Sequence, residues 1–441
     1  MENLIMAGQL LLGLSLLIVL HEWGHYYPAR LFKTRVEKFY LFFDAFNFSL
    51  FKKKIGETVY GIGWLPLGGY VKISGMIDES MDKEQMSGPP QPWEFRSKPA
   101  WQRLIIMLGG VTVNLILGFL IYGMTLFTWG REVSDPASFE NGIEVSSLVE
   151  EYGFENGDRI VDYPNIGLKN FSDMSEDILL FDLRKFTVQK PNGEQKELML
   201  PEDITLKMLE SKTKTLFTPR TYVVIGELAE DAPAEKAGLL VNDSIVGIDG
   251  QKVVFFDEFR QSIKDKSNKE IQLSLYREGV KKEISVQVDS LSRIGFYNKK
   301  SFGKHDTQLL EYGFFESFPA GIEFGWRKLK GIVNSMKYLF TKAGSKQVGS
   351  FISFAKAYGP TWEWQRFWSL TALISIILAF MNILPIPALD GGHVMFLLYE
   401  MISGKAPSQR FMEIAQMIGF FLLIGLIIFA LKNDVVNHLL N

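Results

Sequence analysis

His21, Glu22 and His25 form the pattern H-E-x-x-H at the end of an apolar run that extends from Leu4 to Leu20. On a helix this spacing puts both imidazoles on one face, with the glutamate beside them. Two imidazole nitrogens can bind one zinc ion, and a neighbouring carboxylate can take a proton from water for hydrolysis. The pattern is short, and the alternative is a helix end whose polar residues reach the membrane interface. Because ionisable groups in a membrane segment are costly unless they are paired or bind a metal, we favour a zinc site.

The composition excludes some ligand types and some partners. Of 441 residues, 47% are hydrophobic and 22% are charged, which indicates a mixture of membrane-embedded and water-exposed parts. A net charge of −3 argues against a nucleic-acid partner. The chain has no cysteine, so disulfides and thiolate ligands are excluded, and a zinc ion must be held by His and carboxylate side chains.

Four apolar stretches are long enough to cross a bilayer, which takes about 20 helical residues. They cover residues 4 to about 25, 104–129, 367–384 and about 414–431. We expect the first stretch to be retained rather than removed as a signal peptide, because Glu2 precedes it and a small-residue cleavage pattern is missing.

Basic residues near these stretches predict the orientation. Lysines and arginines are frequent between the first and second stretches, and Lys405 and Arg410 lie between the third and fourth. The positive-inside rule assigns both connections to the cytoplasm. Both termini and residues 131–366 are then expected on the periplasmic side, with the H-E-x-x-H motif toward the cytoplasmic side.

Residues 51–75 have the pattern of strands and turns. Tyr60, Ile62 and Trp64 alternate with glycines, a turn ends at Gly68 and Gly69, and residues 70–73 resume a strand. We predict a membrane-associated β-hairpin that offers an edge strand to an extended peptide, with Gly68 and Gly69 in the substrate-binding region. The alternative is a hairpin on the solvent side that packs its aromatic residues on the helices. Residues 78–100, charged and rich in proline, are predicted to form a loop.

Residues 222–290 alternate short strands with turns and contain the stretches APAEKAGL and NDSIVGIDG. This segment resembles a PDZ domain of the bacterial type. Residues 141–203 repeat the order in weaker form, so that Gly153 aligns with Gly238 and Asp158 with Asp243. We therefore predict two tandem PDZ-like domains, the first of them degenerate.

Apolar residues recur at helical spacing between Ile322 and Phe340, with basic residues off that stripe. This pattern predicts an amphipathic helix. The sequence leaves open whether the helix lies on the outer membrane surface or packs against the PDZ-like domains.

A catalytic zinc usually has three protein ligands and keeps one position for water. Asp390 is the candidate for the third ligand, because it follows the third apolar stretch after two prolines and is also a carboxylate at membrane depth. By the orientation above, the ends of the first and third stretches lie on the same side of the membrane. Asp390 can therefore meet His21 and His25 across more than 360 positions of sequence.

The motif H-E-x-x-H, the later N-x-x-P-x-P-x-L-D-G-G at residues 382–392, and the PDZ-like insertion occur together in this order. In this combination the chain resembles the site-two protease family of intramembrane metalloproteases, in its bacterial RseP-type branch. The likeness covers essentially the whole chain and includes residues 95–103 and Gly110 with Asn114. Two departures are Gly109-Gly110-Val111, where related sequences often have small-Gly-Pro, and residues 376–379, which lack an asparagine that some members carry.

The resemblance implies a role for individual residues. His21, His25 and Asp390 would bind Zn²⁺, and Glu22 would be the general base. Asn382 matches a family asparagine thought to engage the substrate backbone; an interhelical hydrogen bond is the alternative. We expect His393 to have a structural role or to support a ligand, rather than to bind the metal itself.

The sequence thus predicts an α-helical polytopic membrane protein with four transmembrane helices, a membrane-associated β-hairpin and two inserted α+β PDZ-like domains. The predicted domains are residues 1–130 with the first two transmembrane helices, 131–215 and 216–295 as the PDZ-like pair, 296–366 with the amphipathic helix, and 367–441 with the last two transmembrane helices.

The function implied by the resemblance is that of a zinc endopeptidase in the bacterial inner membrane. Its substrates would be single-span proteins, such as anti-sigma factors already trimmed outside or remnant signal peptides, and it would also contact membrane lipid. The PDZ-like pair would gate entry by size or bind newly exposed C-termini. Two other hypotheses are a membrane scaffold that binds partner C-termini without proteolysis, and a membrane zinc enzyme that cuts soluble peptides. The intact set of His21, Glu22, His25 and Asp390 argues against the scaffold.

Overall fold

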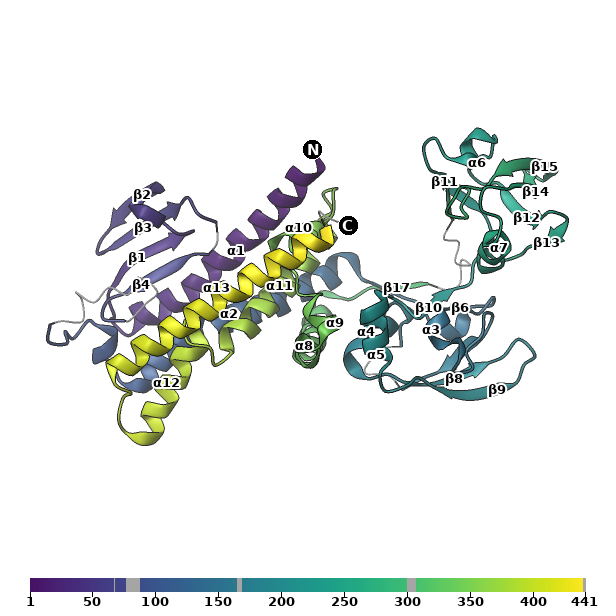
Figure 1. The fold of residues 1–441 in the computed structure, drawn as a ribbon. Helices are drawn as coiled ribbons and strands as arrows, with labels where there is room; N and C mark the ends of the chain where they lie inside the picture. Colours follow the sequence, from purple (N-terminus) through teal and green to yellow (C-terminus); the bar gives the residue numbers. More distant parts are fainter. Residues whose placement is uncertain (67, 77–87, 165–168, 300–306, 439–441) are drawn as a thin grey trace. The chain divides into compact units, whose positions relative to one another are not determined.

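The computed structural model describes the chain except residues 67, 77–87, 165–168, 300–306 and 439–441. The described part forms two compact units, one built from residues 1–130 and 311–441 and the other from residues 131–310 (Figure 1). Much of the loop predicted at 78–100 lies outside the described residues.

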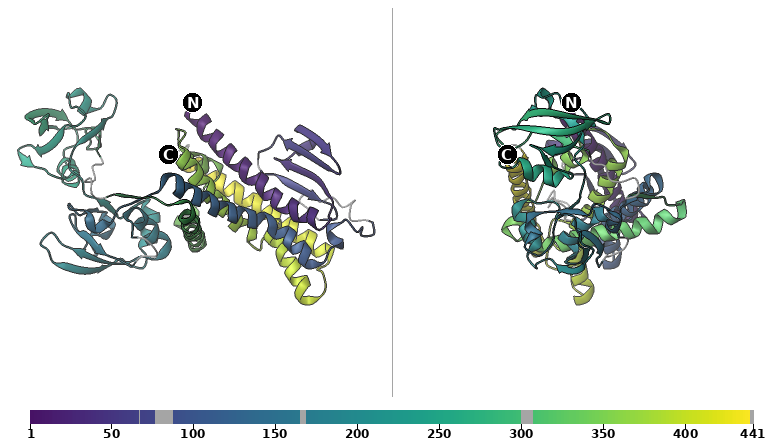
Figure 2. Two further views of the ribbon diagram at one scale, coloured as in Figure 1. Left: turned by 180° about the vertical axis from the view of Figure 1, so that it is seen from behind. Right: turned by 90° about the vertical axis from the view of Figure 1, so that its right-hand side faces the viewer.

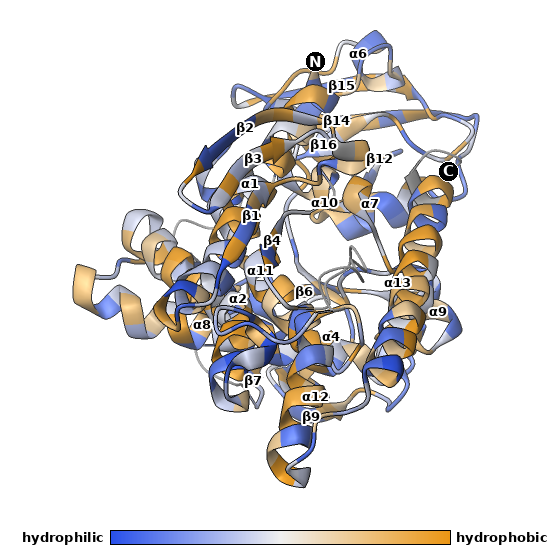
Figure 3. Ribbon diagram, turned by 90° about the vertical axis from the view of Figure 1, so that its left-hand side faces the viewer, coloured by the Kyte–Doolittle hydropathy of each residue, from blue (hydrophilic) through white to orange (hydrophobic). Residues whose placement is uncertain are grey.

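Four long helices dominate the first unit: α1 Glu2–Leu31, α2 Ala100–Trp129, α11 Trp364–Ile383 and α13 Gln409–His438. All four are long and apolar enough to cross a membrane, and they run along a common direction in Figures 1 and 2. Their outward surfaces carry large apolar side chains such as Leu12, Ile116 and Ile428, and Figure 3 shows this apolar character along the helices. The prediction of a polytopic membrane protein with four such helices is confirmed.

The helix α2 lies at the centre of this unit and packs against α1, α11, α12 (Asp390–Ser403) and α8 (Phe314–Leu339). Glycines allow the closest of these approaches. A Cβ atom on Gly24 of α1 would lie 2.5 Å from the carbonyl oxygen of Gly109 on α2. Small residues at helix crossings let two backbones approach in this way inside a membrane.

A four-stranded sheet lies beside the helices and contains β1 Val36–Leu41, β2 Ser49–Ile55, β3 Thr58–Gly63 and β4 Tyr70–Ile73. The strand order is β2-β3-β1-β4, with β1 parallel to β3 and antiparallel to β4. The predicted hairpin between residues 60–64 and 70–73 is therefore wrong, because β1 lies between these two strands. The strand β4 is an edge of the sheet, and it contacts α1.

The amphipathic helix predicted near 322–340 is α8, which begins earlier, at Phe314. It is seen nearly end-on in Figure 1 and from the side in the right-hand view of Figure 2, so it runs across the long helices. It packs on α2 and α11, while Phe315, Ile322 and Trp326 remain exposed. Two short helices follow, α9 Lys342–Ser345 and α10 Phe351–Tyr358.

The second unit contains two successive groups of elements, called copies below, in which strands and helices follow a similar order. The first copy contains β6 Ile143–Val145, α3 Ser147–Glu150, β7 Arg159–Asp162, α4 Phe171–Phe181, β8 Lys185–Gln189, β9 Gln195–Met199, α5 Ile204–Ser211 and β10 Phe217–Pro219. The second copy contains β11 Ile225–Leu228, α6 Pro233–Lys236, β12 Ser244–Ile248, β13 Gln251–Lys252, α7 Phe256–Ile263, β14 Glu270–Arg277, β15 Val280–Gln287 and β16 Phe296–Asn298. In each copy the first strand pairs with the last, and the middle strands form an antiparallel sheet. Each copy also has its own buried apolar core.

The aligned residues of the two copies make equivalent hydrogen bonds. In the second copy, Arg277 donates to the Asp243 carboxylate at 2.6 and 2.7 Å and to the carbonyl of Gly238 at 2.8 Å. In the first copy, Lys190 donates to Asp158 at 3.0 Å and to the carbonyl of Gly153 at 2.7 Å. In each copy, a basic side chain thus connects the aligned glycine to the aligned aspartate. Two short strands, β5 Arg131–Val133 and β17 Gln308–Leu310, pair at the start and end of the unit.

Candidate metal centre

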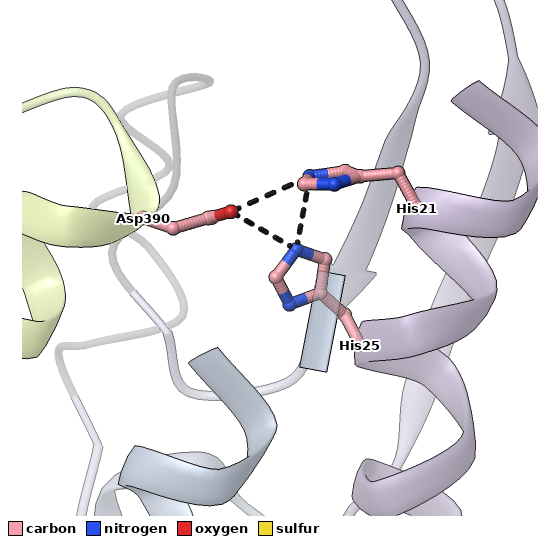
Figure 4. Close-up of side chains that lie close together, drawn as sticks. All are labelled: His21, His25 and Asp390. Carbon is pink, nitrogen blue, oxygen red and sulfur yellow. Dashed lines mark hydrogen bonds and ion pairs between the residues drawn. The ribbon is translucent and has the colours of Figure 1, made fainter. Parts of the chain in front are cut away.

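The H-E-x-x-H residues lie on α1, which continues past them to Leu31. Both imidazoles point to the same side of the helix, as the spacing predicts, and their rings meet edge to face with 4.8 Å between centroids (Figure 4). His25 is 7% exposed, so the pair is largely shielded from solvent.

Asp390 reaches the same place from a turn between two helices. The helix α11 ends at Ile383 and α12 begins at Asp390, with Pro385 and Pro387 in the connection. Proline cannot continue a helix interior, which explains why α11 stops here. Gly391 and Gly392 allow the start of α12 to lie against the backbone of this turn, where a Cβ atom would collide with carbonyl groups. This turn between α11 and α12 directs the Asp390 side chain toward α1 (Figure 4).

Three side-chain atoms converge to a nearly equilateral triangle. The Oδ2 atom of Asp390 lies 3.4 Å from Nε2 of His21 and 3.4 Å from Nε2 of His25, and the two nitrogens are 3.3 Å apart. A tetrahedral zinc with bonds of about 2.0–2.1 Å separates its ligand atoms by about 3.3–3.4 Å. Oδ2 is also buried without a hydrogen-bond partner among the described residues. The donor set and its spacing therefore fit a zinc ion with one open coordination position.

The hydrogen bond on the far side of His25 supports the same arrangement. Its Nδ1 lies 2.8 Å from the backbone carbonyl oxygen of Ile106 on α2. A carbonyl can only accept, so Nδ1 carries the proton and the lone pair of Nε2 faces Asp390 and His21. The helix α2 therefore orients one of the two imidazoles.

Glu22 lies between the metal-ligand candidates and the edge strand β4. Glu22 is 9% exposed, and the backbone N–H of Val71 lies close to its carboxylate. Gly69, just before β4, packs against Ile18 and the side chain of Glu22: a Cβ atom there would lie 2.5 Å from Ile18 and 3.4 Å from Glu22 Cγ. The arrangement leaves Glu22 outside the three-atom cluster but adjacent to it.

The remaining predicted site residues divide into two groups. The Nδ2 atom of Asn382 lies 3.4 Å from Nε2 of His21, so this side chain reaches the cluster. Gly68, one residue before Gly69, packs against the ring of Phe43. His393 is not part of the three-residue cluster, and its ring contacts Phe396.

Sequence reasoning missed the contribution of α2. Gly110 lies against both imidazoles, and Asn114, one helical turn further, lies 3.2 Å from Nδ1 of His21. In the sequence, Gly110 and Asn114 stand out only through the family likeness, and no residue-type pattern assigns them to the site. One of the two departures from the family pattern, at Gly109 and Gly110, falls at the crossing with Gly24. These glycines permit the short distance between α1 and α2.

The chain is similar to known proteins over most of its length. A model of Peptidase family M50 matches residues 9–426. The chain is 27% identical to the regulator of sigma-E protease RseP of Salmonella typhimurium, over 96% of this chain and 97% of that protein. It is 26% identical to the regulator of sigma E protease of Haemophilus influenzae, over 97% of this chain and 98% of the relative. A relative from Vibrio cholerae, described as a candidate zinc metalloprotease, is 27% identical over 96% of this chain and 97% of its own length.

Proposed function

The chain belongs to peptidase family M50 and is a zinc metalloprotease, and from this premise we propose that it cleaves single-span membrane proteins within the bilayer. The observation that carries the proposal is the triangle formed by His21, His25 and Asp390. His21, His25 and the buried Glu22 lie on α1, which is long and apolar enough to span a membrane.

In this proposal His21, His25 and Asp390 hold the metal, and Glu22 is the general base. Bound zinc would supply Lewis-acid chemistry, which polarises water and the scissile carbonyl. The Glu22 carboxylate takes a proton from water and returns it to the leaving amine. Asn382 reaches the same space with its amide, where it can donate a hydrogen bond to the substrate backbone and orient the carbonyl.

The edge strand β4 is the proposed binding site for the substrate backbone. A transmembrane helix satisfies its own backbone groups, so it must unwind locally before a peptide bond becomes accessible. An edge strand offers unpaired N–H and C=O groups to an extended segment. The N–H of Val71 faces Glu22, and Gly68 and Gly69 bring the chain close to α1 just before this strand. A substrate strand paired to β4 would therefore pass beside the general base.

The substrates we propose are anti-sigma factors or remnant signal peptides that another protease has already trimmed on the periplasmic side. The names of the Salmonella and Haemophilus relatives, regulators of sigma E, support the first class. We propose that the two repeats are PDZ-like domains, residues 131–215 and 216–295, which lie in the periplasm and restrict entry or bind new C-termini. The distribution of basic residues supports an inner-membrane orientation with the site toward the cytoplasm.

The proposal is tested with the full chain in detergent and a model transmembrane substrate. We expect Glu22→Gln to reduce cleavage by about 100-fold or more, the usual contribution of a general base, and to leave one zinc per chain. Glu2→Gln, on the same helix, is the control and should change neither quantity. Equal cleavage by wild type and Glu22→Gln would contradict the assignment, and a zinc-loaded wild type that never cuts would favour the scaffold.

A second measurement separates a membrane substrate from a soluble one. The same enzyme is given an unstructured soluble peptide and a helical membrane peptide that contain the same cleavage sequence. We expect faster cleavage of the membrane peptide, and a further increase when helix-weakening residues are placed near the cut. If these residues have no effect, the requirement for local unwinding is wrong.

A further inference from the structure

Asn114 lies where α2 meets α1 and α11, and it is 1% exposed. Its side-chain amide faces Nδ1 of His21 at 3.2 Å, and its backbone carbonyl accepts a hydrogen bond of 2.7 Å from Ser375 of α11. A buried amide beside an imidazole inside a membrane bundle is either an interhelical hydrogen bond or a device that orients the ring.

The chemistry of the imidazole distinguishes these roles. Nε2 of His21 points at Asp390 and His25, so it is the nitrogen available to a metal. A neutral imidazole that binds a metal through Nε2 carries its proton on Nδ1, and this N–H needs an acceptor. His25 has such an acceptor in the carbonyl of Ile106. For His21, Asn114 is the partner that the structure gives to Nδ1.

We propose that Asn114 is a positioning residue for the metal centre, whose Oδ1 accepts the Nδ1–H of His21 and thereby holds Nε2 toward the ion. This inference rests on the zinc site of the proposed function. Nδ2 is the atom nearest to Nδ1, and Oδ1 is buried without a hydrogen-bond partner among the described residues. A half-turn of the amide exchanges the two atoms and gives the oxygen a donor.

The spacing along α2 suits this role. Gly110 lies four residues before Asn114, on the same face of the helix. A Cβ atom on Gly110 would lie 2.6 Å from Cε1 and 2.8 Å from Nδ1 of His21, so the glycine leaves room for the ring. Gly110 therefore makes space for the imidazole, and Asn114 supplies its hydrogen-bond partner one turn later.

The experiment measures zinc affinity rather than cleavage, by competition with a chelating dye on the purified full chain in detergent. Asn114→Leu keeps the size of the side chain and removes the acceptor. Asn114→Asp keeps an oxygen acceptor. Ser375→Ala removes the neighbouring interhelical hydrogen bond without touching His21, so it is the matched control for loss of packing.

We expect Asn114→Leu to bind zinc 10–100-fold more weakly than wild type, the usual effect of removing the partner of a metal-binding histidine. Asn114→Asp should stay within a few-fold of wild type, and Ser375→Ala should be unchanged. Equal affinity of Asn114→Leu and wild type would overturn the inference, as would equal losses in Asn114→Leu and Ser375→Ala or in Asn114→Leu and Asn114→Asp. A wild type that binds no zinc would instead contradict the proposed function.

Discussion

Gly110 determines how closely α2 can approach the two imidazoles. A single methyl group at this position would overlap the rings of His21 and His25, which are already held by Asp390 and by Ile106. The rings cannot move away without losing the triangle of ligand atoms. The glycine is therefore a requirement of the site as well as of the helix crossing.

We predict that Gly110→Ala lowers the zinc affinity of the chain at least tenfold. This is comparable to the effect of removing a group that supports a metal ligand. The measurement is the same dye competition on the full chain. Gly425→Ala is the matched control, because Gly425 lies on the membrane helix α13 and a Cβ atom there meets nothing within 4 Å. Similar affinities for the two variants would show that the rings adjust to the methyl group.

The residues of the site differ in how far the sequence could predict them. The structure brings His21, His25 and Asp390 together as the motifs and the membrane orientation indicated. The contribution of Ile106 could not be predicted, because a backbone carbonyl has no residue-type signal. Asn114 could not be assigned to His21 from its own neighbourhood, because the contact depends on the crossing of α1 and α2 at glycines.

At the scale of elements, the position of β4 depends on a small polar cluster at its first residue. The Asp44 carboxylate accepts hydrogen bonds from the Tyr70 hydroxyl at 2.7 Å and from Lys38 at 2.9 Å. The ring of Tyr70 also stacks between Tyr40 and Phe43. These contacts connect β4 to β1 and to the loop that follows β1, so they hold the proposed substrate-binding edge in place.

We predict that Asp44→Ala raises KM for the model membrane substrate about fivefold, because loss of one net hydrogen bond is worth about 1 kcal/mol. Zinc affinity should not change, since Asp44 does not contact the metal ligands. Glu57→Ala is the control: Glu57 lies in the same sheet region, and its carboxylate is 60% exposed in a 4.0 Å ion pair with Arg30. A change in kcat with constant KM would mean that β4 does not bind the substrate.

The buried carboxylate of Asp243, directly before β12, is a second feature at the scale of elements. Burial raises the pKa of Asp243, but the hydrogen bonds from Arg277 and from the Leu240 N–H outweigh this effect and hold the pKa below its usual value. A depressed folded-state pKa contributes stability above the unfolded pKa, near 4, and this contribution is lost as pH falls through the folded pKa.

We therefore predict that the second repeat becomes less stable as the pH is lowered below about 4, and that Asp243→Asn, which has no carboxylate to protonate, shows a smaller pH dependence. The full chain is unfolded in urea at each pH, and hydrogen exchange is read on its peptides from β12 and β14. The urea midpoint of these peptides measures the stability of the second repeat. Asp249→Asn removes a second carboxylate of this repeat, in the β12–β13 turn, where hydrogen bonds from Lys266 and from the Gln272 N–H also lower the pKa of Asp249. It measures how much of the pH dependence comes from a more exposed carboxylate. Identical pH profiles for wild type and Asp243→Asn would contradict the prediction.

The elements that the sequence does not predict differ in their physical cause. The sequence suggested pairing between neighbouring strands, whereas β1 separates β3 from β4 through a parallel pairing with β3. This pairing depends on contacts across the sheet and not on local turn signals. The sequence does not predict α12, because two prolines interrupt the apolar pattern just before it. By contrast, β14 and β15 lie within the segment 222–290, where the sequence predicts short strands separated by turns.

At the scale of the whole molecule, residues 131–310 have the features of an inserted module. The strands β5 and β17, at the two ends of this segment, pair antiparallel with Arg131 opposite Leu310. The chain thus enters and leaves the unit at adjacent points. Termini that lie close together are what makes a domain removable or insertable without disturbing its host.

We predict that replacing residues 131–310 with a short Gly-Ser linker leaves zinc affinity unchanged, because all candidate ligands and Asn114 belong to the other unit. The shortened enzyme should still cut a trimmed membrane substrate. If the repeats restrict entry, it should also cut a substrate that keeps its periplasmic domain, at a rate at least tenfold above that of the full chain. The two rates are compared in vesicles that contain both proteins, with Glu22→Gln in the shortened chain as the background control. Loss of cleavage of the trimmed substrate, with zinc still bound, would indicate that the repeats deliver substrates rather than exclude them.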